Sequence, residues 1–131
     1  MTAEHGWDLN LGMRNSVGLV RRVLRVNGLH IVEELELSAA SADTPGCVVL
    51  LVDSPELLFE AIALDRAAAV LVPLHVVVTG DGHRSRVHWT NPLAFSGLHA
   101  PASARVAIER LCARLKQALS RALDSAVSAV H

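Results

Sequence analysis

Polar and apolar positions between residues 71 and 92 follow the pattern of a β-hairpin. An apolar run up to Val78 is followed by a Gly-Asp-Gly segment, and polar and apolar residues then alternate strictly up to Trp89. Asp-Gly between two β-rich runs favours a type I′ turn, which requires positive φ at both central residues. The pattern therefore predicts two antiparallel strands joined by a two-residue turn.

The turn also fixes a register. With Asp81 and Gly82 as the central residues, positions whose numbers sum to 163 lie opposite each other, so His75 pairs with His88. One face of the hairpin is then core, and it carries Leu74, Val76, Val78, Val87 and Trp89. The other face is largely polar, and it carries His75, Val77, Thr79, Arg84, Arg86 and His88.

The chain up to residue 52 predicts three strands and one helix. Residues 7–13 alternate as a half-buried strand, and Asn15 or Ser16 offers an N-cap for a helix that Gly28 ends. Residues 29–37 form a less regular strand, with a bulge expected near Glu33–Glu34. Residues 38–45 are a loop, and the unbroken apolar run 47–52 is typical of a central strand covered on both faces.

Two further helices are expected. Asp53-Ser54-Pro55 resembles a helix start, and the apolar positions that follow predict a helix to about residue 63. A terminal helix of about 28 residues begins near Pro101 or Ala102. We expect either that this helix packs across the sheet with a frayed end, or that its far half packs on a second copy. Its apolar stripe comprises Ile108, Leu111, Cys112, Leu115, Leu119, Ala122, Ala126 and Val130.

The predicted order is therefore β-α-β-β-α-β-β-α in a single domain over residues 1–131. This order is typical of an α+β two-layer sandwich, with helices on one face of a mostly antiparallel sheet. The composition, 51% hydrophobic and 19% charged with a net charge of −1, is that of a globular protein without a field that attracts nucleic acid. No segment resembles a signal peptide or membrane helix, and two cysteines fit a reducing cytosol, so we expect a cytoplasmic protein.

Several segments resemble the bacterial family called domain of unknown function 302. They are Asp53-Ser54-Pro55 after a buried strand, the strand beginning Pro73-Leu74-His75, and the ending His88-Trp89-Thr90-Asn91-Pro92. The chain departs from the family pattern where His75 replaces a basic residue and Trp89 a tyrosine. The resemblance implies a fold similar to half of the TATA-binding protein and implies homodimers. It implies no established activity.

The polar hairpin face is the candidate site, with His75, Arg84, Arg86 and His88 as its residues. A solvated sheet face accounts for them most simply. Arg86 beside two opposed imidazoles alternatively favours a small anionic ligand. A metal would require a third ligand, for which Asp53, His99 and His30 are candidates, and Arg86 would repel a cation.

Other features carry less chemistry. Asp53-Ser54-Pro55 favours ordinary helix capping over anion binding, and Ser54 lacks the frame of a catalytic serine. With two Trp, two Phe and no Tyr, there are few stacking platforms for nucleic acid. We therefore expect a cofactor-free, homodimeric domain that binds a small ligand or a partner. The alternatives are an enzyme that uses His75 and His88 on an anionic substrate, and a purely structural dimer built on the terminal helix.

Overall fold

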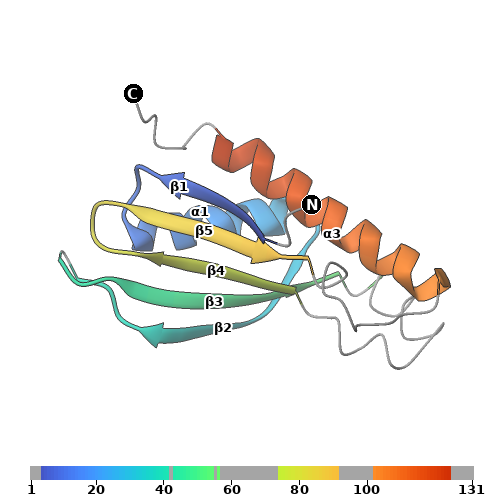
Figure 1. Cartoon of the computed structure of the whole chain (residues 1–131), viewed down its shortest axis with the longest axis horizontal. Coiled ribbons are helices and arrows are strands. Elements are labelled where there is room, and N and C mark those ends of the chain that lie inside the picture. Colours follow the sequence, from blue (N-terminus) through green and yellow to red (C-terminus); the bar gives the residue numbers. More distant parts are fainter. Residues whose placement is uncertain (1–3, 42, 55, 57–73, 92–101, 125–131) are drawn as a thin grey trace.

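The computed structural model describes residues 4–41, 43–54, 56, 74–91 and 102–124 (Figure 1). These residues form five strands and two helices. The elements are β1 (Glu4–Leu9), α1 (Met13–Val26), β2 (His30–Ser38), β3 (Gly46–Asp53), β4 (Leu74–Gly80), β5 (Ser85–Thr90) and α3 (Ala102–Leu123).

The strands form one antiparallel sheet in the order β1-β5-β4-β3-β2. In Figure 1, α1 lies behind the sheet. α3 contacts α1 and buries its apolar side chains in the same core, so both described helices cover one face. This confirms the predicted α+β fold with helices on one face. None of the helices in the described residues is long and apolar enough to cross a membrane.

The core lies between the helices and the inner face of the sheet. Every second residue of β3, β4 and β5 is buried on that face, including Leu50, Val76 and Trp89. From α3, the predicted apolar stripe is buried at Ile108, Leu111, Cys112, Leu115 and Leu119, together with Leu123. The stripe positions beyond residue 124 and the expected helix to residue 63 lie outside the described residues, apart from Glu56, which is helical.

The first strand and helix begin earlier than predicted. β1 ends at Leu9, and the N-cap of α1 is Gly12 rather than Asn15 or Ser16. The amide of Met13 donates a hydrogen bond to the carbonyl of Asp81 at 2.8 Å, so a distant backbone group replaces a capping side chain. Ser16 is buried inside the helix instead.

The predicted end of α1 is confirmed. Gly28 has a φ of +74°, its amide bonds to the Arg25 carbonyl, and the Leu29 amide bonds to the Leu24 carbonyl. These two bonds are the Schellman pattern, which favours glycine at the left-handed position.

The expected irregularity in β2 is also confirmed. Its register against β3 shifts between Ile31 and Glu33, and again between Glu36 and Ser38. After the first bulge, Leu35 pairs with Val49 on the side away from the helices. The inward positions of β2 are then Glu34 and Glu36, opposite core positions of β3.

The predicted hairpin is confirmed, but the predicted turn and register are wrong. β4 and β5 pair with position sums of 165, two residues away from the predicted register, and neither Asp81 nor Gly82 has positive φ. The Asp81 carboxylate accepts hydrogen bonds from the amides of His83 and Arg84 at 2.8 and 2.9 Å. These bonds lower the pKa of the Asp81 carboxyl and stabilise a four-residue loop instead of the type I′ turn.

The loop is also joined to α1. The hydroxyl of Ser85 donates to the carbonyl of Leu11 at 2.8 Å and is hydrogen-bonded to the hydroxyl of Ser16. Both serines are buried, so their hydroxyl groups are satisfied within the core. The start of α1 is therefore held against the end of the hairpin.

Gly80 is the glycine at which we expect a substitution to matter most. Its φ is +155°, and a Cβ there would collide with the carbonyl oxygen of Arg84 and with Ser85. Gly80→Ala should lower the free energy of unfolding by about 2 kcal/mol or more in urea denaturation. Gly18→Ala is the control, because a Cβ at Gly18 meets nothing within 4 Å inside α1, and it should gain about 0.5–1 kcal/mol. Equal effects of the two changes would contradict the loop geometry.

Candidate functional site: the outer face of the sheet

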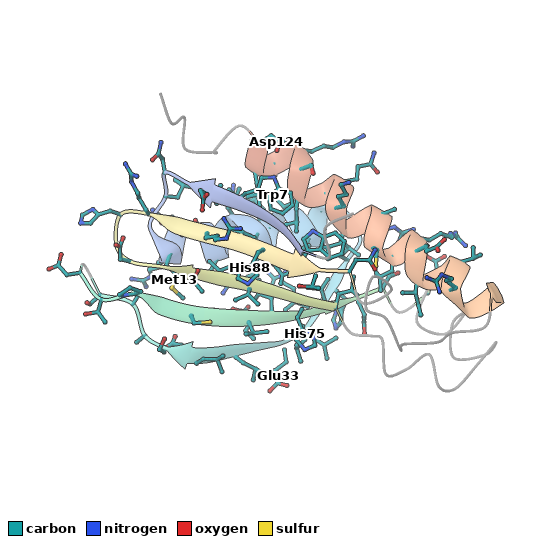
Figure 2. All side chains as sticks on the ribbon, in the orientation of Figure 1. Trp7, Met13, Glu33, His75, His88 and Asp124 are labelled. Carbon is teal, nitrogen blue, oxygen red and sulfur yellow. The ribbon has the colours of Figure 1, made fainter. Side chains whose placement is uncertain are left out.

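The candidate site lies on the outer face of the sheet, which we define as the face opposite α1 and α3. The strands cross this face side by side in Figure 2, and their outward residues form three rows. Listed from β2 towards β5, the first row is Glu33, Leu51 and His75. The second row is Leu35, Val49, Val77 and His88. The third row is Ser38, Cys47, Thr79 and Arg86.

His75 and His88 are not opposed, which corrects the central prediction about the site. His88 lies opposite Val77, whereas His75 lies one row away, opposite Leu51 of β3 (Figure 2). A shift of two residues retains each side chain on its predicted face but places the two imidazoles on a diagonal, where separations are about 7–8 Å. The direct pair that an acid–base or metal role would have used is therefore absent.

The two arginines lie at the other end of the hairpin. Arg86 forms an ion pair with Asp8 of β1, with 3.0 Å between Nη1 and Oδ1, because β1 pairs with β5 in a register that places Asp8 opposite Arg86. Arg84 belongs to the loop. Both arginines line a hollow of about 400 Å³ together with Asp8, Thr79 and Gly80, so the structure brings Arg84 and Arg86 together and leaves His75 and His88 outside.

The pairing with Asp8 was not predicted. The order β1-β5 joins the first strand to the last one, and no local pattern reports which strands become neighbours across such a distance. The alternation of residues 7–13 placed Asp8 on the polar side of its strand, and this was the only available signal.

The predicted third metal ligands do not complete a site. His30 lies opposite Asp53 at the edge of the sheet, and His99 lies outside the described residues. Burial raises the pKa of the Asp53 carboxyl, and the charge of His30 partly offsets this rise. In the part of the chain that the structure describes, no group of three or more His, Cys, Asp or Glu side chains could hold a metal ion.

Ser54 and Cys112 are nucleophilic side chains, and neither lies in an environment that would activate it for catalysis. Ser54 is buried, and its hydroxyl accepts a hydrogen bond from Arg114 at 3.4 Å. Burial raises the pKa of the Cys112 thiol to about 12, so the reactive thiolate is scarce at neutral pH.

The outer face contains an apolar row that we did not predict as part of the site. The row consists of Leu35, Val49 and Val77, with Leu51 beside it. Leu35 is 38% exposed, and the other three side chains are half-buried in the middle of this face. The signal was present in the unbroken apolar run of β3, which predicted cover on both faces. Within the described residues, helices cover only the inner face.

Comparison with known proteins agrees with this fold. A family model described as domain of unknown function DUF302 matches residues 7–126, and no curated protein matches the chain. The crystal structure of an uncharacterized conserved DUF302 protein from Bacillus stearothermophilus is similar, with a TM-score of 0.78 and 14% sequence identity. The similarity covers 93% of this chain and 99% of that chain. Because the family model spans most of the sequence, the chain belongs to the DUF302 family.

Proposed function

We propose that this chain is an interaction domain that forms a homodimer through the outer faces of two sheets. The observation that carries the proposal is the apolar row of Leu35, Val49 and Val77, with Leu51 beside it, on a face without a described helix. Contiguous apolar side chains on a sheet face are a common feature of protein interfaces. A second copy would remove them from water.

The distribution of charge favours a second copy as the occupant. The apolar residues lie on β3 and β4, so a two-fold axis between these strands would stack the apolar centre on itself. If the axis runs parallel to the strands, it also places β2 of one copy over β5 of the other. Such an axis preserves the position along the strands, so Glu33 of β2 would lie over the His88 end of β5. Arg86, further along β5, adds positive charge to the same flank.

The edge of the sheet is a less suitable interface. β2 is an edge strand with three glutamates, Glu33, Glu34 and Glu36, and two such edges would repel each other if they paired. The described part of α3 is also less suitable, because its apolar stripe is buried in the core of its own chain. These two considerations favour the outer face over the β2 edge and over the terminal helix, respectively.

The area of the face sets the expected strength of the dimer. Four overlapping strands measure about 19 Å across and about 20 Å along their length, so two copies cover about 800 Å² in total. This lies below the roughly 1,200–2,000 Å² of stable specific interfaces and is typical of weak, transient ones. We therefore expect a dimer that dissociates on dilution.

A lysine in the middle of the outer face should disrupt the dimer. Val77→Lys places a charge within the apolar row, which should weaken association by at least about 2 kcal/mol, or roughly thirty-fold. Light scattering behind size exclusion over a range of protein concentrations measures this change. Val106→Lys is the control, because Val106 is 52% exposed on α3, away from the sheet face. If Val77→Lys dimerises as the wild type does, the outer face is not the interface.

A small anion at the hollow of Arg84 and Arg86 is the second candidate function. The observation that favours it is that Arg84 and Arg86 both line one hollow of about 400 Å³. Asp8 also lines this hollow and partly neutralises Arg86, so we expect only weak binding.

Phosphate titration tests the second candidate. Millimolar phosphate should raise the melting temperature of the wild type by a few degrees, and this rise should disappear in Arg84→Gln. Arg105→Gln removes an arginine that pairs with Glu109 on α3 instead, and it should retain the response. Identical responses of all three proteins would show that phosphate does not bind at the hairpin.

A further inference from the structure

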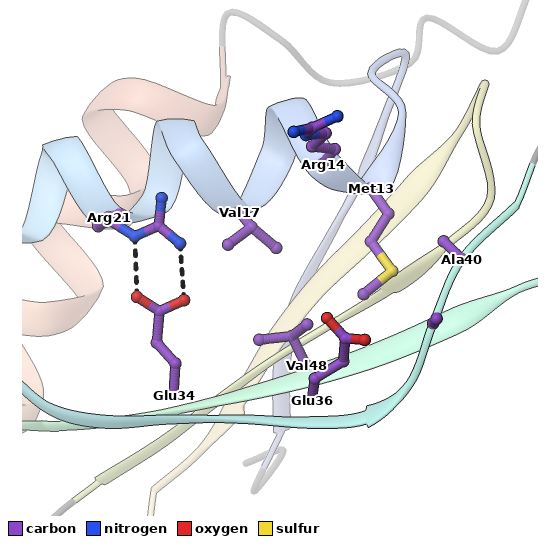
Figure 3. Close-up of a pocket in the computed structure, with 9 residues that line it drawn as sticks. Met13, Arg14, Val17, Arg21, Glu34, Glu36, Ala40 and Val48 are labelled. Carbon is purple, nitrogen blue, oxygen red and sulfur yellow. Dashed lines mark hydrogen bonds and ion pairs between the residues drawn. The ribbon is translucent and has the colours of Figure 1, made fainter.

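A separate cavity of about 510 Å³ opens between α1 and β2 on the inner side of the sheet (Figure 3). Its apolar residues include Met13 and Val17 of α1 and Val48 of β3, all of which are at most 8% exposed. Ala39 and Ala40, just beyond β2, line it with small side chains. The volume is within the range of sites that bind small molecules.

The wall formed by β2 is charged, although its inward positions oppose the core. Glu34 and Glu36 pair in register with Leu50 and Val48. Arg21 of α1 satisfies Glu34 with two hydrogen bonds of 2.8 and 2.7 Å, and they lower the pKa of the Glu34 carboxyl. This ion pair bridges the helix and the strand at one end of the cavity (Figure 3).

Glu36 has no such partner. Within the described residues its carboxylate makes no hydrogen bond or ion pair, and in Figure 3 this carboxylate lies between Met13 and Val48. Arg14 also lines the cavity, and in Figure 3 its guanidinium lies apart from the Glu36 carboxylate. The cavity therefore presents one unpaired carboxylate beside an apolar floor.

We infer that this cavity binds a small organic cation with an alkyl body. A protonated amine would donate hydrogen bonds to Glu36, since charge-assisted bonds of this kind are the strong ones. The alkyl chain would lie against Met13, Val17 and Val48 and leave water. The Arg21–Glu34 pair would limit the length of the alkyl chain at its end of the cavity. This site is independent of the outer face, because its residues lie on the other side of the sheet.

Isothermal titration with hexylammonium tests the inference, with hexanoate and hexanol as matched ligands. The wild type should bind hexylammonium with millimolar or better affinity, and hexanoate and hexanol at least about ten-fold more weakly. Glu36→Gln, which removes the charge at nearly constant volume, should weaken hexylammonium binding by about ten-fold or more.

Glu33→Gln is the matched control, because it makes the same change on the same strand at an outward position. It should bind hexylammonium as the wild type does, and circular dichroism should show both variants folded. The inference is overturned if hexylammonium does not bind, if hexanoate binds equally well, or if both variants lose affinity to the same extent.

Discussion

The β-bulge between Ile31 and Glu33 determines which side chains of β2 face the helices. Without it, strict alternation from the inward Ile31 would turn Glu33 and Leu35 toward the core. The bulge reverses this order, so that Leu35 joins Val49 on the outer face while Glu36 faces inward. One additional residue thus creates both the edge of the apolar row and the charged wall of the cavity.

The two sides of the sheet consequently offer different chemistry. The inner side is closed by α1 and α3 over most of its area, and the cavity remains where β2 carries glutamates instead of apolar residues. The outer side is flat and apolar at its centre, with Glu33 on one flank and Arg86 on the other. A flat apolar surface suits a second protein surface, whereas a cavity with one unpaired carboxylate suits a small cation.

Much of the fold could be predicted because period-two alternation is independent of turn geometry. The hairpin faces are correct, since a register shift of two residues leaves every side chain on its own side. The predicted register is wrong because the Asp81 carboxylate accepts hydrogen bonds from two backbone amides, which favours a longer loop. The start of α1 was misplaced for a related reason, since the group that bonds to its first amide is the carbonyl of Asp81, far along the chain.

The candidate site was less predictable, because it depends on distances between strands. The separation of His75 from His88 follows from the turn, and the pairing of Arg86 with Asp8 follows from the order of strands. The apolar row could have been predicted from the unbroken run in β3, had its outer half been considered as a surface for another chain. The cavity has no sequence signal beyond the bulge, because its walls come from elements that only the fold brings together.

Sedimentation velocity on Glu33→Lys and Glu36→Lys tests the central claim most directly, because one residue lies on each side of β2. We predict that the wild type forms a dimer that dissociates on dilution. Glu33→Lys should shift the equilibrium toward monomer, since it places a cation opposite the flank of Arg86, and Glu36→Lys should behave as the wild type. A wild-type monomer at every concentration, or equal dissociation of both variants, would contradict the account.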